Sequence, residues 1–175
     1  MKSLDYLSAN STQSLREGIA ELRIAEGAEN DAAEHLAPEL LDDIDIHDAI
    51  HVLFACPTDL RGEIIAHIWT AFGTTVSMAD MHRVNAHRDH REVLRQIGHR
   101  KLIATWLRSI PTIGKTLLRA RRMKAKWPVE EMDQFLDRPL NELRSDFGIR
   151  VIPFDEGSGR SGGAALRKQI NAAGA

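Results

Sequence analysis

The chain has 175 residues, of which 43% are hydrophobic and only 5% aromatic, and its formal net charge is −2. This length suits one globular domain with its own core, and the low aromatic content disfavours a strand-rich sandwich. The single cysteine, Cys56, excludes an intramolecular disulfide framework and favours a reducing compartment. No apolar run reaches the roughly 18 residues of a membrane span, and the first residues lack a secretory or transit pattern, so we expect a cytoplasmic protein.

Charge is distributed unevenly along the chain. Residues 24–60 contain ten acidic residues and no Lys or Arg, whereas residues 81–126 contain thirteen Lys or Arg residues and two acids. A basic segment of this density is typical of a solvated helix face. It also suits an anionic membrane surface, a phosphate-bearing ligand or nucleic acid.

Hydrophobic periodicity predicts helices along almost the whole chain. The first begins at the capping-box sequence SLRE, residues 14–17, and continues to Gly27. A short helix is expected over 30–37, where Pro38 interrupts it, and a further helix is expected over 45–56.

The next helix is predicted to be capped by Thr58, with Asp59 in its first turn, and to end at Gly73. Its expected buried face consists of large apolar residues at helical spacing: Leu60, Ile64, Ile65, Ile68, Trp69 and Phe72. Over 78–108 we expect two helices, or one helix with a break near Gly98.

Pro111 and Gly114 predict a turn, after which the basic segment 115–126 is expected to form an amphipathic helix. A short helix is predicted to open at Pro128. The last helix is predicted to carry Pro139 in its first turn and to end at Gly148. Its expected inward residues are Leu140, Leu143 and Phe147. We therefore predict an all-α fold, a single-domain helical bundle over residues 1–150, followed by a short irregular Gly/Ser-rich tail over 151–175.

One segment is a candidate metal site: HDAIH over residues 47–51, with eleven residues between His51 and Glu63. On a helix the two histidines lie about 40° apart in projection, and Asp48 lies about 100° from His47. An antiparallel helix pair after Pro57 can bring Glu63 back against the histidines. Two imidazoles and two carboxylates suit zinc or non-haem iron, with positions left open for substrate or water.

The same segment resembles a known family. The sequence HDAIHVLFACPTDLRGE, from His47 to Glu63, is similar to the HDxxH…E motif of the coenzyme Q (ubiquinone) biosynthesis proteins of the Coq-four type. A second similarity lies downstream, where a basic run and Trp127 precede DRPLNELRSDFGI over residues 137–149. Together the two segments place most of residues 10–150 in the resemblance.

The resemblance implies an all-helical protein that binds one divalent metal ion through His47, Asp48, His51 and Glu63. Zinc is the first choice, with Fe²⁺ or Mn²⁺ as alternatives. It further implies decarboxylation of a polyprenylated hydroxybenzoate ring, either simple or oxidative with a hydroxyl replacing the carboxyl. Other ubiquinone-biosynthesis proteins and a second copy of the chain are the implied protein partners, and the protein is expected on the inner face of the cytoplasmic membrane.

Other function classes stay open at this point. A non-catalytic lipid-binding scaffold could use the metal only to pin two helices together. A metal-dependent phosphohydrolase of the HD type also uses adjacent His and Asp, with His35 and Asp80 as candidate further ligands. A zincin-type protease is disfavoured because Asp48 replaces the general-base Glu of HExxH.

Further histidines are weaker candidates. His67 lies one turn beyond Glu63 and is either an additional ligand or a partly buried histidine. A run rich in His and Arg, containing His82, His87, His90 and His99, is either a second metal site or a solvated face.

The basic segment predicts a membrane contact. Residues 115–127 combine six basic side chains, an apolar side and a terminal Trp127, which suits an anionic membrane surface that holds a polyprenylated aromatic lipid. No nucleic-acid partner is expected, because the chain is acidic overall and has neither a recognition turn nor zinc-finger spacing.

Overall fold

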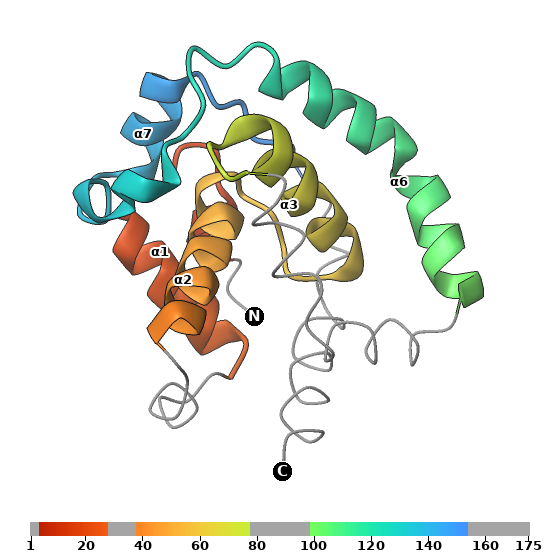
Figure 1. Cartoon of the computed structure of the whole chain (residues 1–175), viewed down its shortest axis with the longest axis horizontal. Coiled ribbons are helices and arrows are strands. Elements are labelled where there is room, and N and C mark those ends of the chain that lie inside the picture. Colours follow the sequence, from red (N-terminus) through yellow and green to blue (C-terminus); the bar gives the residue numbers. More distant parts are fainter. Residues whose placement is uncertain (1–3, 28–37, 78–98, 154–175) are drawn as a thin grey trace.

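A computed structural model of the chain describes residues 4–27, 38–77 and 99–153 (Figure 1). The regular elements are η1 (Asp5–Leu7), α1 (Leu15–Ala25), α2 (Pro38–Leu53), α3 (Leu60–Gly73), α6 (His99–Ala120), η3 (Val129–Gln134) and α7 (Leu140–Phe147). Extended backbone in the described ranges forms isolated bridges, Ser14 with Pro139 and Thr74 with Trp127, and no strand. The all-α prediction is confirmed. Among these described helices, none combines the length and apolar character needed to cross a membrane.

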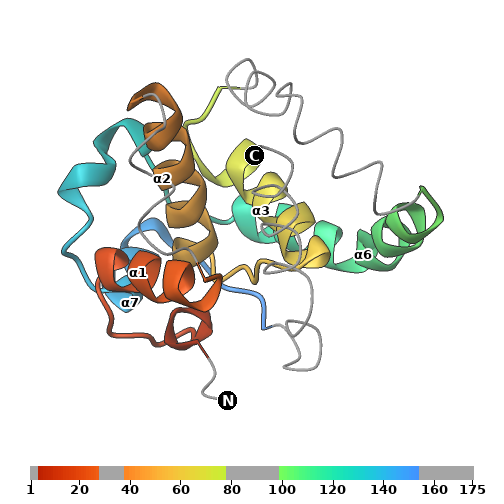
Figure 2. The same ribbon diagram turned by 90° about the horizontal axis from the view of Figure 1, so that it is seen from below.

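The helices are arranged around α2 and α3. α1 packs beside α2, and α3 lies between α2 and α6 in both Figure 1 and Figure 2. α7 contacts the C-terminal end of α2. The largest fully buried side chains include Tyr6, Leu15, Leu22, Leu53, Phe54, Ile65, Trp69, Trp127, Leu140 and Leu143. Phe54 stacks on Trp69 with ring centroids 4.5 Å apart, so one aromatic pair joins α3 to the end of α2.

The start of α1 follows the sequence prediction. The Ser14 hydroxyl accepts the backbone N–H of Glu17 at 3.2 Å, and the Glu17 carboxylate accepts the Ser14 N–H at 2.8 Å. This reciprocal pair is the capping box, and it satisfies two donors that the first turn of a helix leaves unpaired.

Two helix starts differ from their predictions. α2 begins at Pro38 rather than near residue 45, because a proline at the first helical position gives up an N–H that needs no partner. α3 is capped by Asp59, not by Thr58: the Asp59 carboxylate accepts the Gly62 N–H at 2.7 Å. The predicted helix over 30–37 lies outside the described residues.

The predicted turn at Pro111 and Gly114 is wrong, because α6 continues through both residues to Ala120. The missing proline N–H costs a helix interior about 3 kcal/mol, which packing must offset. α6 supplies that packing through its extensive contact with α3. Residues after 120 leave the helix, so the expected basic helix over 115–126 is divided between the end of α6 and an irregular segment.

The buried face of α3 is narrower than predicted. Ile65 and Trp69 are buried as expected, whereas Leu60, Ile64 and Ile68 are partly buried. Phe72 is 49% exposed, so its assignment to the core is wrong.

The last elements keep close to their predicted positions. η3 follows Pro128, and Pro139 stands just before α7 as its cap residue rather than inside the first turn. Gly148 ends α7 with φ +71°, a left-handed conformation that favours glycine. Leu140 and Leu143 are buried and Phe147 is partly buried. Of the helices expected over 78–108, the part over 99–108 is the first half of α6, whereas residues 78–98 and the tail beyond 153 lie outside the described residues.

Candidate metal centre

The corner between α2 and α3 is built by a helix-ending turn. Ala55 has φ +53°, and the Cys56 N–H reaches back to the His51 carbonyl at 2.8 Å while the Ala55 N–H donates to Val52 at 3.2 Å. These two bonds form a Schellman ending, in which alanine stands at the position that glycine usually takes. The turn brings the Cys56 backbone alongside His51.

The corner is also closed from the α3 side. A Cβ atom at Gly62 would lie 1.7 Å from the Pro57 carbonyl oxygen, so only glycine permits this approach. The Asp59 carboxylate, which caps α3, accepts the Gly62 N–H and so fixes Gly62 beside Pro57. Glu63 follows directly and faces α2, which explains why the sequence places Gly and Glu next to each other after the proline.

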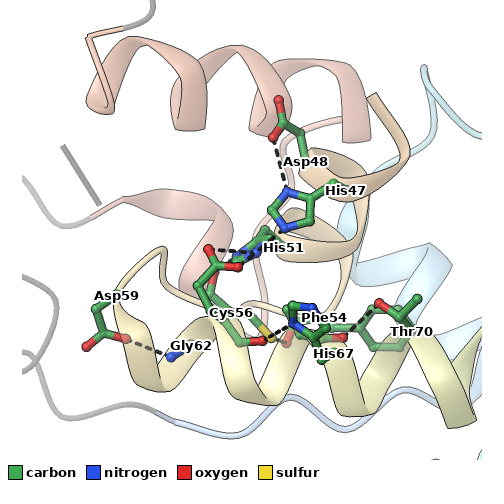
Figure 3. Close-up of polar contacts among 11 residues, drawn as sticks. His47, Asp48, His51, Phe54, Cys56, Asp59, Gly62, His67 and Thr70 are labelled. Carbon is green, nitrogen blue, oxygen red and sulfur yellow. Dashed lines mark hydrogen bonds and ion pairs between the residues drawn. The ribbon is translucent and has the colours of Figure 1, made fainter. Parts of the chain in front are cut away.

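Three side chains from the two helices converge at this corner (Figure 3). His47 Nε2 lies 3.4 Å from Glu63 Oε2, and His51 Nε2 lies 3.3 Å from Glu63 Oε1. One ligand-type atom from each residue lies within 4.8 Å of the other two. The His47 side chain is 42% exposed and Glu63 is 22% exposed, whereas His51 is 1% exposed, so the cluster opens to solvent on the His47 side.

The tautomer of His51 follows from its partner. Its Nδ1 lies 3.2 Å from the Cys56 carbonyl, which can only accept, so Nδ1 carries the proton and, in the neutral imidazole, Nε2 presents a lone pair. That buried Nε2 has no hydrogen-bond partner, because its geometry toward Glu63 does not make a hydrogen bond. A buried unpaired acceptor costs about 1–3 kcal/mol, and a coordinated cation would remove this cost.

Asp48, predicted as a fourth ligand, lies outside this cluster. Its Oδ2 accepts Arg23 Nε of α1 at 2.8 Å, and its Oδ1 lies 3.7 Å from His47 Nδ1. In Figure 3 the carboxylate of Asp48 lies on the side of His47 away from His51. The 100° offset from His47 turns Asp48 toward α1, where it can orient the imidazole without facing Glu63.

The electrostatics of the cluster favour a proton on His47 and a charge on Glu63. Burial lowers the pKa of His47, but hydrogen bonding and charge attraction from Asp48 and Glu63 outweigh burial and raise the pKa to about 10. Burial raises the pKa of Glu63, but the two imidazoles that face its carboxylate outweigh burial and hold that pKa well below its usual range. A cation entering the cluster would take the place of this proton.

The three residues suit a divalent cation. With metal–ligand bonds of about 2.1 Å, neighbouring ligands in a four- or six-coordinate site lie about 3.0–3.4 Å apart. The two His–Glu distances of 3.3 and 3.4 Å fall near this spacing. Two imidazoles and one carboxylate leave positions open, as in the His₂Glu sites of zinc enzymes and the facial triads of non-haem iron enzymes.

The other sequence candidates take different places. His67 is partly buried, and its Nδ1 donates to the Glu63 carbonyl at 2.8 Å, so it supports the helix one turn beyond the cluster. The side chain of His99 and the whole of the remaining candidates, His35, Asp80, His82, His87 and His90, lie outside the described residues. Sequence reasoning missed Arg23 and the Cys56 carbonyl, because neither belongs to a ligand pattern.

Comparison with known proteins finds no relative of this chain. The chain matches no protein-family model, no curated protein and no solved structure. The site is therefore interpreted from its own residues.

Proposed function

We propose that this protein is a metal-dependent enzyme of ubiquinone biosynthesis. It binds a divalent cation, Zn²⁺ before Fe²⁺ or Mn²⁺, through His47, His51 and Glu63. The substrate is a polyprenylated hydroxybenzoate, and the reaction removes its ring carboxylate. The observation that carries the proposal is the orphaned Nε2 of His51 beside Glu63, within a sequence that resembles the Coq-four type motif.

The reaction needs stabilisation of negative charge. The bond between the ring carbon and the carboxyl carbon breaks, carbon dioxide leaves, and the ring carbon keeps the electron pair and takes up a proton. A bound cation supplies Lewis acidity and holds the anionic end of the substrate. The oxidative form would need a two-electron oxidant that zinc cannot supply, since zinc itself has no redox chemistry, so the simple decarboxylation is the step proposed.

The chain's own residues have distinct parts in this scheme. His51 is held rigidly by the Cys56 carbonyl and aims its lone pair into the cluster. Glu63 neutralises part of the cation's charge, and half-exposed His47 lies on the side from which substrate would enter. Asp48, anchored by Arg23, orients His47. Substrate or water would reach a bound cation from the half-exposed His47 side of the cluster.

The two other function classes account for fewer observations. An HD-type phosphohydrolase uses its adjacent Asp as a ligand, whereas Asp48 lies against Arg23. A scaffold would need the ion only to tie α2 to α3, and it gives no role to the solvent-facing side of the cluster. That solvent-facing side favours the enzyme.

The proposal is tested by metal analysis and by lipid mass spectrometry. We expect about one divalent ion per chain in the purified protein, with the ion lost on Glu63→Ala. Cells that lack the protein should accumulate a carboxylated polyprenyl ring, which wild type and the neighbouring control His67→Gln remove and His47→Ala does not. A metal-free wild-type protein would overturn the metal site. Full rescue by His47→Ala would favour the scaffold.

A further inference from the structure

α6 packs on α3 through a face of unusual composition. Its fully buried residues within 105–120 are small and mostly hydroxylated, Ser109, Thr112, Thr116 and Ala120, and partly buried Thr105 continues the same stripe, with partly buried Ile113 beside it. The Thr116 hydroxyl bonds back to Thr112, and Thr112 accepts Arg61 of α3 at 2.6 Å. α6 therefore meets α3 through small polar side chains, although an amphipathic helix ordinarily turns its large apolar residues inward.

Most large apolar residues in the described side chains of α6, residues 105–120, face outward instead. Trp106 is 54% exposed, and the other strongly exposed apolar side chains in this range are Leu107, Ile110 and Leu118. At about 100° per residue, these four positions centre about 150° from the buried stripe. α6 forms the outer arm of the molecule in Figure 1 and Figure 2, and this apolar face lies opposite the stripe that packs on α3.

The charged residues beside this apolar face are all basic. From His99 to Val129 the sequence contains no Asp or Glu. Arg108 and Lys115 are exposed and lie about 20° apart on the helix, at one edge of the apolar face. Arg121 and Arg122 are exposed just after its end. An apolar face bordered only by cations is the composition of helices that lie in the surface of an anionic bilayer.

We propose that the outward face of α6, formed by Trp106, Leu107, Ile110 and Leu118 and bordered by Arg108 and Lys115, docks on an anionic phospholipid membrane. This surface overlaps the segment expected from sequence, 115–127, only at Lys115 and Leu118, and otherwise lies on the preceding turns of α6. Trp127, the aromatic end of that segment, is fully buried, so it is not available to lipid. Apolar side chains in the middle of the surface favour lipid over nucleic acid, whose binding needs cations facing phosphate.

The intrinsic fluorescence of the protein can report this contact directly. The chain has three tryptophans, of which Trp69 and Trp127 are fully buried and Trp106 is half exposed. Adding phosphatidylglycerol-containing vesicles to the full chain should shift the emission to shorter wavelength and reduce acrylamide quenching at least twofold. Vesicles of phosphatidylcholine alone should do so much less. An unchanged spectrum with both vesicles would overturn the proposal.

Sedimentation with vesicles tests the residues. Leu107→Ser with Ile110→Ser should lower partitioning at least tenfold, and Arg108→Gln with Lys115→Gln should lower it severalfold at low salt. The matched control is Ile24→Ser, an apolar residue 80% exposed on α1, which should partition like wild type. Each variant should keep its helical circular dichroism and its metal content, so a failure here is distinguishable from failure of the metal site.

Two results would assign the face to another partner. Loss of a dimer in analytical ultracentrifugation on Leu107→Ser with Ile110→Ser, with vesicle binding unchanged, would assign it to a second copy of the chain. Binding to a short DNA duplex that depends on Arg108 and Lys115, without vesicle binding, would assign it to nucleic acid. Either result overturns the lipid proposal.

Discussion

Arg144 of α7 and His51 of α2 are both buried at the C-terminal part of α2, but their hydrogen-bonding capacity is met very differently. Arg144 donates to the carbonyls of Tyr6, Ser8, Val52 and Leu53 at 2.6–2.9 Å. His51 uses Nδ1 on Cys56 and leaves Nε2 without a hydrogen-bond partner. One polar group is fully enclosed by backbone, and the other points an unused lone pair at a carboxylate.

The difference separates a structural polar group from a functional one. Arg144 is held by backbone carbonyls, two of them from the last turn of α2, where the helix dipole is negative. Burial lowers its pKa to about 10, which still leaves it charged at neutral pH. It joins the N-terminal segment, α2 and α7. His51 contributes less to the fold than it could, because its second nitrogen makes no hydrogen bond, and we propose that this nitrogen binds the cation.

The largest expected effect is on the Arg144 junction. Arg144→Met should lower the free energy of unfolding by about 3–5 kcal/mol, because it removes four hydrogen bonds to carbonyls of two segments, the N-terminal one and the end of α2. Urea denaturation measures the change. Arg138→Met is the control, since Arg138 pairs with Asp146 and Glu142 at the surface, and its loss should cost about 1 kcal/mol or less. Equal effects of the two variants would contradict the structural role of Arg144.

Substitutions in the metal cluster should have the opposite pattern, with a large effect on metal binding and a small effect on stability. Glu63→Gln should weaken binding of Zn²⁺ at least about 100-fold, because an amide replaces the only anionic ligand, whereas the metal-free protein should lose less than about 2 kcal/mol. Chelator competition measures affinity, and urea denaturation of the metal-free protein measures stability. A large loss of stability with unchanged affinity would make Glu63 a structural residue.

A smaller effect is expected at Asp48. Asp48→Asn should weaken metal binding about 10–100-fold, because it removes the charge that orients His47 from the far side of the ring. Asp137→Asn is the matched control: Asp137 also accepts an arginine Nε at 2.8 Å, from Arg16, but at the exposed surface. Isothermal titration with Zn²⁺ should leave the control at wild-type affinity. Similar loss in both variants would exclude a specific role for Asp48.

The smallest effect concerns pH. Because the pKa of His47 is raised to about 10, the metal-free cluster holds a proton that the metal must displace, and affinity should rise about tenfold per pH unit between 6.5 and 8.5. In the metal-free protein the sign is opposite. The stabilisation by protonated His47 is complete below its ordinary pKa of 6.5 and is lost as pH rises toward 10. His47→Ala should flatten both dependences, as measured by chelator competition and by denaturation across this range.

Local patterns predicted the parts of the site that lie within one helix. The spacing of His47 and His51 places both on one side of α2, and the SLRE capping box and Gly148 mark helix ends as predicted. Glu63 was within reach of sequence reasoning because a proline turn between two helices limits where the second can begin. Such features depend on neighbours a few residues apart, which covalent geometry fixes in space.

Tertiary structure decided the rest. In the folded chain Asp48 pairs with Arg23 instead of facing Glu63. α6 continues through Pro111 because its packing on α3 offsets the lost hydrogen bond. The tertiary structure also buried Arg144 among backbone carbonyls of two segments and left the apolar face of α6 outside. The sequence by itself determined which residues share a helix face. Only the fold determined what each face meets, because such contacts join residues far apart in the chain and depend on how all the helices pack together.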